Sequence, residues 1–586
     1  MDKKEPEGRN IVICLDGTGN EIGSNLSNVL KLYRMTVKDE KQLVYYDPGV
    51  GTVGKPGWWS GAKQITEQVL GLALGLGLDS NVLDAYSWLC RTWQEGDRVY
   101  LFGFSRGAYS ARVLAGFIHL CGLLHPEQLN LCGYAMVAYK QSGDRGNMEI
   151  GRNFRRLSGA RRILIHFIGC WDTVSSVIVP RPDRLFIPSR QTLPYTRRNP
   201  SVRTFRHAVS MDERRRMFRL NHWEDPQPFR RSPFERDQEE DQDIRQVWFA
   251  GMHSDVGGGY PEPQSGLSKY PLLWMIAQAQ AAELRLDQRL VRLFGDGGTT
   301  RGRAGKTYTY VAPDPAAEMH KSLTGPWWLL EPIPQRTKEK EWPRRRSFLG
   351  FYIPWAEPRP IPNRPWEGVP SNDPFFIHSS VLARIKARSD YRPVNLPAAY
   401  EVDTTGGPPD TVPPPPFEPE RLGARLKRLF GTVPASADWR LLGREALVLV
   451  PVLAILGFLG NFLDAGPGVG SGFPLLALVA LAFVLFDETL FRGILMKPPP
   501  GGASAIGPAA LSAALFVLWH PLLVLACALA SGGKCTSRWA WLGTDPWFLA
   551  ALFGLGLVCA RVTLASRSIW PAVALHWLVA TAWLAA

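Results

Sequence analysis

A serine between two glycines, in "LFGFSRGAYS", has the spacing of a reactive turn: Gly103, Ser105 and Gly107. The apolar residues 99–104 before it predict a buried strand. After it, apolar residues recur at helical spacing and predict a helix that begins at Arg106. Glycines permit a tight strand-to-helix turn, and such a turn exposes the serine hydroxyl at the carboxyl end of a sheet. We therefore predict that Ser105 is a nucleophile, provided that the chain also supplies a base and an acid.

Two later strand ends offer these partners. Asp172 follows the apolar run "ILIHFIGCW", and His253 follows "VWFAGM". A serine hydroxyl needs a base to remove its proton, and the base needs a carboxylate to orient it. The chain order Ser, Asp, His is that of α/β-hydrolases. We predict that His253 is the base and that Asp172 orients it, although an aspartate in this place is also compatible with a loop cap.

An oxyanion formed during ester cleavage would need backbone donors. The N–H of Arg106 lies at the predicted helix start, where it can stabilise negative charge. The glycine-rich loop "DGTGN", residues 16–20, offers a second N–H from Gly17 or Thr18. This loop lacks the Lys-Ser/Thr spacing of a phosphate-binding P-loop. Asp16 is compatible with two roles, organising the loop or binding a cation.

The elements that must position these residues lie within residues 10–397, where predicted strands alternate with helices. Strand–helix alternation with polar residues at strand ends predicts an α/β-hydrolase-like, mostly parallel sheet with flanking helices. We assign residues 1–400 to this domain. The Arg- and Pro-rich segment 180–246 is expected to be an insertion between strands. Its alternatives are a lid or surface-docking region, or a flexible connection.

The composition changes after this domain. Residues 401–440 form a Pro-rich and basic linker, and residues 441–586 are expected to form an all-α bundle of several transmembrane spans. Each apolar stretch approaches the ~20 residues that cross a bilayer. The stretches are 446–462, 473–495, 506–530, 547–564 and 570–586. Arginines and lysines cluster before the first stretch, so the positive-inside rule predicts a cytoplasmic N-terminal domain on a bacterial inner membrane.

The charge and the cysteines limit the classes of partner and compartment. The net charge is +14, from 67 basic and 53 acidic residues. No nucleic-acid recognition motif accompanies this excess, so we expect no nucleic-acid partner; a solvated surface or attraction to anionic lipid headgroups remains. The eight cysteines lie far apart without a Cys-x-x-Cys pair. This pattern favours a reducing compartment over a disulfide framework or a zinc site.

Six ordered motifs resemble the α/β-hydrolase domain of the type VI secretion phospholipase effector-like family. They are "ICLDGTGN", "YYDPGVGT", "LFGFSRGAYSAR", "FIGCWDTVSS", "MDERRRMF" and "FAGMHSDVGGGY". The family nucleophile, acid and base fall on Ser105, Asp172 and His253. The resemblance implies hydrolysis of lipid esters, with phospholipids the best-known substrates and no cofactor.

The membrane half resembles a second family, the CPBP intramembrane proteases, which include CAAX-processing enzymes. "FDETLFRG", "FVLWH" and "SIWPAVALHW" carry the resemblance. The matching site residues are Asp487, Glu488, Arg492, His520 and His576. Two positions depart from the family pattern, since Asp487 replaces a glutamate and Ala580 replaces an asparagine or aspartate. A metal at His520 and His576 stays an open question.

The leading hypothesis is a membrane-anchored serine hydrolase whose substrates are lipids or other esters in membranes. The first alternative is peptide cleavage by the C-terminal bundle, with a membrane peptide as substrate. The second alternative is a non-catalytic membrane anchor or immunity-like partner. The departures at Asp487 and Ala580 favour the second alternative for the bundle alone.

Overall fold

The computed structural model divides the chain into two compact units, residues 1–414 and 415–586. The division lies within the predicted linker. The residues that the structure describes are 8–17, 25–49, 77–144, 146–174, 178–180, 188–190, 193–215, 217–231, 240–302, 305–324, 327–328, 331, 335–336, 341–342, 351–352, 357, 359–362, 375–393, 395–397, 399–408, 422–460, 473–496, 506–530 and 545–585.

The N-terminal unit is built on an eight-stranded sheet of order β18-β17-β10-β7-β4-β3-β1-β2. Each pairing of neighbouring strands is parallel. Its strands are β1 (Asn10–Leu15), β2 (Gln42–Asp47), β3 (Arg98–Phe104), β4 (Ile165–Trp171), β7 (Val202–Ser210), β10 (Asp243–Phe249), β17 (Phe376–His378) and β18 (Glu401–Asp403). The predicted mostly parallel sheet is therefore confirmed.

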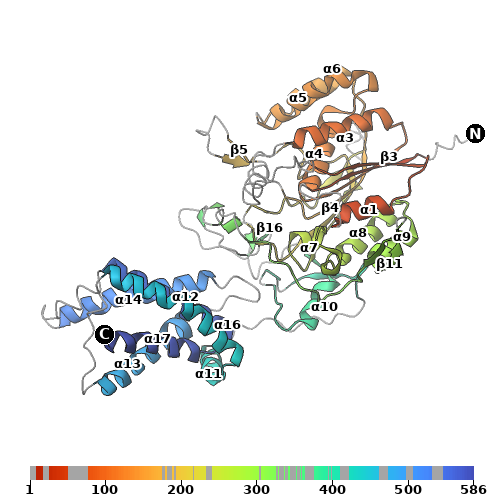
Figure 1. Cartoon of the computed structure of the whole chain (residues 1–586). Helices are drawn as coiled ribbons and strands as arrows, with labels where there is room; N and C mark the ends of the chain where they lie inside the picture. Colours follow the sequence, from red (N-terminus) through yellow and green to blue (C-terminus); the bar gives the residue numbers. More distant parts are fainter. Residues whose placement is uncertain are drawn as a thin grey trace, which may run out of the picture. The chain divides into compact units, whose positions relative to one another are not determined.

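Helices cover both faces of the sheet (Figure 1). On one face lie α3 (Leu78–Thr92), α4 (Arg106–Cys121), α5 (Cys132–Asp144) and α6 (Glu149–Ser158). On the other face lie α1 (Asn28–Met35), α8 (Lys269–Ala281) and α9 (Gln288–Gly295). Parallel sheets are found with both faces covered, because crossover helices pack on them.

Alternation along the strands separates the core into two layers. In β1, Ile11 and Ile13 pack into the cluster that contains α3 and α4, whereas Val12 and Cys14 pack into the cluster that contains α1 and α8. Successive side chains of a strand point to opposite faces, so a strand buried on both sides is apolar throughout. This explains why the strands of the sequence appear as continuous apolar runs.

The expectation for segment 180–246 was wrong in one respect, because residues Val202–Ser210 form β7 inside the sheet, between β4 and β10. Buried polar side chains interrupt the apolar pattern of this strand, so its sequence does not resemble that of a buried strand. Arg206 pairs with Asp243 on the neighbouring strand, with Nη2 and Oδ2 2.7 Å apart. His207 is fully buried and accepts a hydrogen bond from the Thr173 N–H. Polar partners thus replace apolar packing in this part of the sheet.

Short elements complete the N-terminal unit. They are η1 (Pro126–Leu131), β5 (Ile178–Pro180), β6 (Pro188–Arg190), β8 (Pro228–Phe229), β9 (Glu240–Asp241), α7 (His253–Gly257), η3 (Glu262–Gln264), β11 (Gly298–Arg301), β12 (Thr307–Tyr310), β13 (Gln335–Arg336), β14 (Glu341–Trp342), β15 (Phe351–Tyr352), β16 (Ile361–Pro362) and α10 (Ser379–Ala387). Among them α7 begins at His253, one of the predicted site residues.

The C-terminal unit is helical. It comprises α11 (Leu422–Gly431), α12 (Ser436–Gly460), α13 (Phe473–Glu488), the π-helical segment η6 (Thr489–Leu495), α14 (Ile506–Ala530), α16 (Pro546–Ser566) and α17 (Trp570–Ala585). Within the described residues, one helix, Pro546–Ser566, has both the length and the apolar composition to cross a membrane, with a mean hydropathy of 2.0. Shorter apolar helical segments span Ala509–Pro521 and Trp570–Ala582. For the remaining stretches, membrane spanning stays a prediction.

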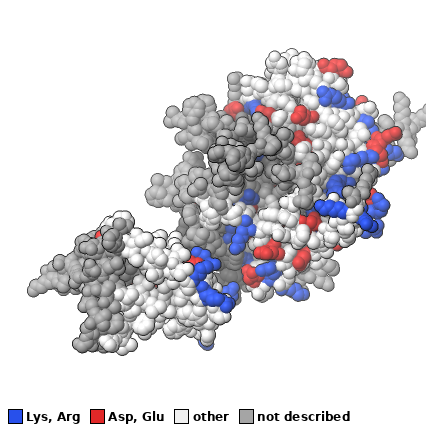
Figure 2. All heavy atoms as spheres, viewed as in Figure 1, with Lys and Arg blue, Asp and Glu red and all other residues white. Residues whose placement is uncertain are grey.

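The two units differ in their surfaces (Figure 2). On the face shown, basic and acidic side chains are mixed over the N-terminal unit. Among the described residues of the C-terminal unit, the face shown is mostly uncharged, with basic side chains grouped together.

Candidate active site

Ser105 occupies a strained turn between β3 and α4. Its φ is 58° and its ψ is −120°, a backbone conformation that non-glycine residues rarely adopt. A Cβ on Gly107 would lie 2.1 Å from the carbonyl oxygen of Leu15, and a Cβ on Gly103 would lie 2.5 Å from the backbone of Gly107. Both contacts are impossible, so the two glycines are sterically required where α4 starts against the end of β1.

The structure brings the three predicted side chains together at the carboxyl ends of the strands. His253 Nε2 lies 2.7 Å from Ser105 Oγ, and His253 Nδ1 lies 2.5 Å from Asp172 Oδ2. All three residues are buried, with relative exposures of 8% for Ser105, 4% for His253 and 0% for Asp172. A continuous hydrogen-bonded chain of this kind can carry a proton from a hydroxyl to an imidazole that a carboxylate orients.

The Asp172 carboxylate accepts hydrogen bonds from other groups besides His253. Both of its oxygens accept hydrogen bonds from the Arg359 guanidinium, at 2.7 Å and 2.9 Å, and Oδ1 also accepts one from the Ser210 N–H. Burial by itself raises the pKa of Asp172, but attraction to Arg359 and the hydrogen bond with His253 outweigh it and hold the pKa well below its usual range. Asp172 is therefore ionised at neutral pH.

His253 is kept neutral by its surroundings. Burial lowers the pKa of the imidazole, and attraction to Asp172 offsets this only in part. The ring packs against Phe104 and meets Phe218 edge-on, with ring centroids 4.7 Å and 4.8 Å away. The His253 N–H donates to Oε2 of the buried Glu213 at 3.1 Å. A neutral, positioned imidazole at pH 7 has the protonation state that a general base requires.

The structure describes two of the three predicted oxyanion donors, Arg106 and Gly17. Arg106 is the first residue of α4, so its N–H lies at the helix N-terminus beside Ser105. Gly17 is adjacent to Ser105, since a Cβ on it would lie 3.3 Å from the Ser105 Cβ. Its N–H, however, donates to Asp16 Oδ1 at 2.7 Å, so binding an oxyanion would require that hydrogen bond to break. Thr18 lies outside the described residues.

Asp16 has the contacts of a carboxylate that organises a loop. Besides the Gly17 N–H, it accepts hydrogen bonds from the hydroxyls of Ser27 and Tyr46. Ser27 in turn caps the first turn of α1 by accepting from the Leu30 N–H. Asp16 thereby links the end of β1 to α1 and β2.

Sequence reasoning missed the residues that support Asp172 and His253. Arg359 stands 187 positions from Asp172 in the chain, within "EPRPIP", which carries no local pattern. Glu213 and Arg215 form a buried ion pair with Nε and Oε1 3.0 Å apart. They belong to the motif "MDERRRMF", and that motif was the one signal that could have drawn attention to them.

The C-terminal unit gathers three of its five predicted site residues. His576 Nδ1 lies 2.9 Å from Glu488 Oε1, and Arg492 Nε lies 3.2 Å from Glu488 Oε2. Arg492 also donates to the Gly556 carbonyl at 3.0 Å. Glu488 and Arg492 are fully buried. The cluster therefore joins α13, η6, α16 and α17 through charged groups inside the bundle.

The other two predicted residues lie differently. His520 bonds to the carbonyl of Phe516 in its own helix at 2.9 Å, and the Phe516 ring meets both His520 and His576 edge-on. Asp487 is the last but one residue of α13, half-buried and next to Glu488 in the chain. Across the described parts of both units, no group of three or more His, Cys, Asp or Glu side chains is arranged to hold a metal ion.

Comparisons with known proteins divide the chain in the same way. Residues 9–278 match the family of the T6SS phospholipase effector Tle1-like catalytic domain, and residues 470–582 match the type II CAAX prenyl endopeptidase Rce1-like family. The uncharacterized protein YEL023C of Saccharomyces cerevisiae is 34% identical over 227 residues, which cover 36% of this chain and 32% of that protein. The chain thus matches about a third of the length of this curated relative.

Two solved structures show weaker similarity. One is an uncharacterized protein from Pseudomonas aeruginosa, with 19% identity, a TM-score of 0.26, and coverage of 48% of this chain and 46% of the other. The second is the Tle1 effector bound to the VgrG spike from the Type 6 secretion system, with 16% identity, a TM-score of 0.26, and coverage of 50% and 63%. The family matches therefore make residues 9–278 similar to Tle1-like phospholipase catalytic domains, and residues 470–582 similar to Rce1-like CAAX endopeptidases.

Proposed function

We propose that the N-terminal unit is a serine hydrolase that cleaves ester bonds of lipids, with phospholipids as the expected substrates. The observation that carries this proposal is the unbroken hydrogen-bonded chain from Ser105 through His253 to Asp172 at the end of β3. The match of residues 9–278 to phospholipase effector catalytic domains supports the substrate class.

In the proposed reaction, His253 accepts a proton and then returns it in each of two steps. Ser105 Oγ attacks the ester carbonyl while its proton moves to His253 Nε2, and the imidazolium is stabilised by Asp172. The tetrahedral intermediate collapses, the alcohol leaves with the proton from His253, and an acyl-enzyme remains. Water then attacks the acyl-enzyme, gives its proton to His253, and releases the fatty acid as Ser105 recovers its proton. The Arg106 N–H is the first proposed oxyanion donor, and the loop at Gly17 and Thr18 is the second.

We also propose that the C-terminal unit anchors the enzyme in the membrane. Large apolar side chains on its surface support this, since water-soluble surfaces rarely expose so many together. Those with at least half of their surface exposed, among the described residues, are Val433, Leu447, Val448, Val450, Ile455, Leu478, Phe483, Phe486, Leu511, Leu518 and Leu578. Anchoring raises the local concentration of an enzyme near lipid substrates. By the positive-inside rule we place the N-terminal unit on the cytoplasmic side of a bacterial inner membrane.

A second candidate function is peptide cleavage by the C-terminal unit. The buried cluster of Glu488, Arg492 and His576 favours it, because charged groups inside a membrane bundle usually mark a functional site. The Rce1-like match supports a membrane-peptide substrate. Asp487 and Ala580, which depart from the family pattern, leave a purely structural role for this cluster as the competing interpretation.

The serine hypothesis is tested by labelling the full chain, purified in a neutral detergent, with a fluorophosphonate probe. We expect the probe on Ser105, and we expect Ser105→Ala to lose both labelling and release of fatty acid from phospholipid micelles. Ser110, buried in the next turn of the same helix, provides the control, since Ser110→Ala should keep both activities. Undiminished hydrolysis by Ser105→Ala would refute the proposal.

A further inference from the structure

A cavity lies in the N-terminal unit, away from Ser105. It has a volume of about 480 Å³ and is lined in part by His119 and Leu120, in the last turn of α4. Ser105 caps the opposite end of this helix. At ~1.5 Å per residue, the stretch of α4 between Ser105 and His119 is about 21 Å long. Part of its wall comes from residues just before β4 and β7, Arg162, Arg198 and Pro200, so the cavity lies at the amino-terminal edge of the sheet.

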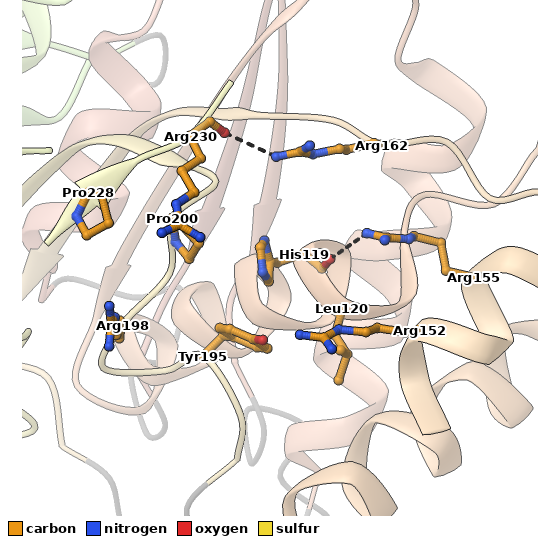
Figure 3. A pocket seen from close by; sticks show the side chains of 10 residues that line it. All are labelled: His119, Leu120, Arg152, Arg155, Arg162, Tyr195, Arg198, Pro200, Pro228 and Arg230. Atoms are coloured by element: carbon orange, nitrogen blue, oxygen red, sulfur yellow. Dashed lines mark hydrogen bonds between the residues drawn. The ribbon is translucent and has the colours of Figure 1, made fainter. Parts of the chain in front are cut away.

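Arginine dominates the lining of this cavity (Figure 3). Five of the ten lining residues are arginines, and none of the ten is acidic. They come from α6, the connection between α6 and β4, the chain before β7, and the position just after β8: Arg152, Arg155, Arg162, Arg198 and Arg230. We call this cavity the arginine pocket. Guanidinium groups stay charged at every physiological pH, so folding brings positive charges from distant segments together. Of the five, Arg152 also pairs with Glu149, with Nη1 and Oε1 2.7 Å apart.

Backbone contacts hold part of this set in place. Arg155 Nη1 donates to the carbonyl of His119 at 3.2 Å, and Arg162 Nη2 donates to the carbonyl of Arg230 at 3.1 Å (Figure 3). Each bond uses one of five N–H donors on the guanidinium. The side chains are thereby oriented before any ligand arrives, which reduces the entropy that binding must overcome.

His119 lies beside three of these arginines. Burial, and then repulsion from Arg162, Arg155 and Arg152, lowers the pKa of His119 to about 3. The neutral ring bonds to the Ser201 hydroxyl and meets Tyr195 edge-on, with ring centroids 4.3 Å apart. Two uncharged rings, those of His119 and Tyr195, therefore line the pocket beside the arginines.

We propose that the arginine pocket binds a small anion that carries phosphate groups. The planar fork of arginine matches the oxygens of phosphate in paired hydrogen bonds. The volume falls in the range of small-molecule sites, about 300–1,000 Å³, so the pocket can accept a body attached to the phosphate. The same chemistry is offered by a soluble phosphate compound and by the headgroup of an anionic phospholipid.

Titration of inorganic pyrophosphate into the full chain, purified in neutral detergent, tests the binding. The pocket variant is Arg155→Gln with Arg198→Gln, and the control variant is Arg156→Gln with Arg203→Gln. The control removes the same charge from exposed arginines on α6 and β7 that do not line the pocket. We expect saturable binding to the natural chain, weakened about tenfold or more in the pocket variant and unchanged in the control. Equal weakening in both variants would show that the loss of pyrophosphate affinity follows from the lower net charge, and would overturn the proposal.

Chemical protection gives a second readout that needs no variant and separates the two sources of phosphate. Phenylglyoxal modifies accessible arginines, and peptide mapping compares Arg155 and Arg198 with Arg156 and Arg203. Protection of the pocket pair by pyrophosphate in neutral detergent indicates a soluble ligand. Protection only after phosphatidylglycerol is mixed into the micelles indicates a lipid headgroup. If neither additive protects Arg155 and Arg198 more than the control pair, the pocket is not a phosphate site.

Discussion

Replacing Arg359 by methionine should lower the activity of the proposed site while Ser105, His253 and Asp172 themselves stay unchanged in sequence. Arg359 and Asp172 are 4% and 0% exposed as side chains, and the guanidinium donates to both carboxylate oxygens at 2.7 Å and 2.9 Å. Methionine keeps much of the apolar stem and removes the charge. Asp172 would then keep the penalty of burial while losing the attraction that offsets it.

The size of the effect follows from this burial. Removing one partner of a buried ion pair costs about 3–5 kcal/mol of unfolding free energy. Since the pKa of Asp172 in the folded chain lies below its unfolded value of about 3.9, its pairing stabilises the fold above that pH. The contribution is lost as the pH falls toward the folded pKa. A misplaced imidazole also costs on the order of 100-fold in kcat/KM, as expected for errors of about 1 Å.

The pH profile distinguishes this effect from simple instability. The lowered pKa of His253 places the acid limb of kcat/KM for lipid-ester hydrolysis below about pH 6.5 in the natural chain. Arg359→Met removes a positive charge beside the Asp172–His253 pair, so the pKa of both groups should rise and the acid limb set by His253 should move to higher pH. Arg359→Lys, which keeps one positive charge, should restore part of the profile.

Arg384 offers a matched control. It is also buried, at 2% exposure, and its Nη1 donates to the carbonyls of Pro315 and Ala317. Arg384→Met should therefore lower the melting temperature without moving the acid limb. The reasoning is refuted if Arg359→Met keeps the natural acid limb and kcat/KM, or if Arg384→Met shifts the limb equally.

Three further predictions test the turn, the orienting acid and the second unit. Gly107→Ala should prevent stable folding, because its Cβ would lie 2.1 Å from the Leu15 oxygen. Gly133→Ala, in open space within α5, should be tolerated, and thermal unfolding of the two variants makes the comparison. Asp172→Asn should lower kcat by about 10⁴-fold while the fold persists, as checked by ester hydrolysis and circular dichroism. Full activity would exclude the orienting role. Glu488→Gln should abolish cleavage of a membrane-peptide substrate while leaving fluorophosphonate labelling of Ser105 intact; loss of labelling would show that the two units are not independent.

The local pattern around Ser105 carried most of what the sequence could determine. Close contacts with neighbouring backbone leave room only for hydrogen at Gly103 and Gly107, so the spacing of three residues specifies the turn. The positions of Asp172 and His253 followed from a general property of parallel sheets, whose carboxyl ends meet at one edge. Burial on both faces explains why β1, β3 and β4 were readable as apolar runs, while β7, with its buried Arg206 and His207, was not.

Contacts between distant segments were decided by the tertiary structure alone. Arg359 reaches Asp172 across 187 positions, and no periodicity or motif relates a guanidinium to a carboxylate at that separation. The arginines of the pocket appeared in the sequence only as surplus charge, since α6, β8 and the chain before β7 meet only after folding. Short-range sterics and hydrophobic periodicity are encoded in neighbouring residues, whereas electrostatic pairing depends on distances in space that only the packed sheet and helices create.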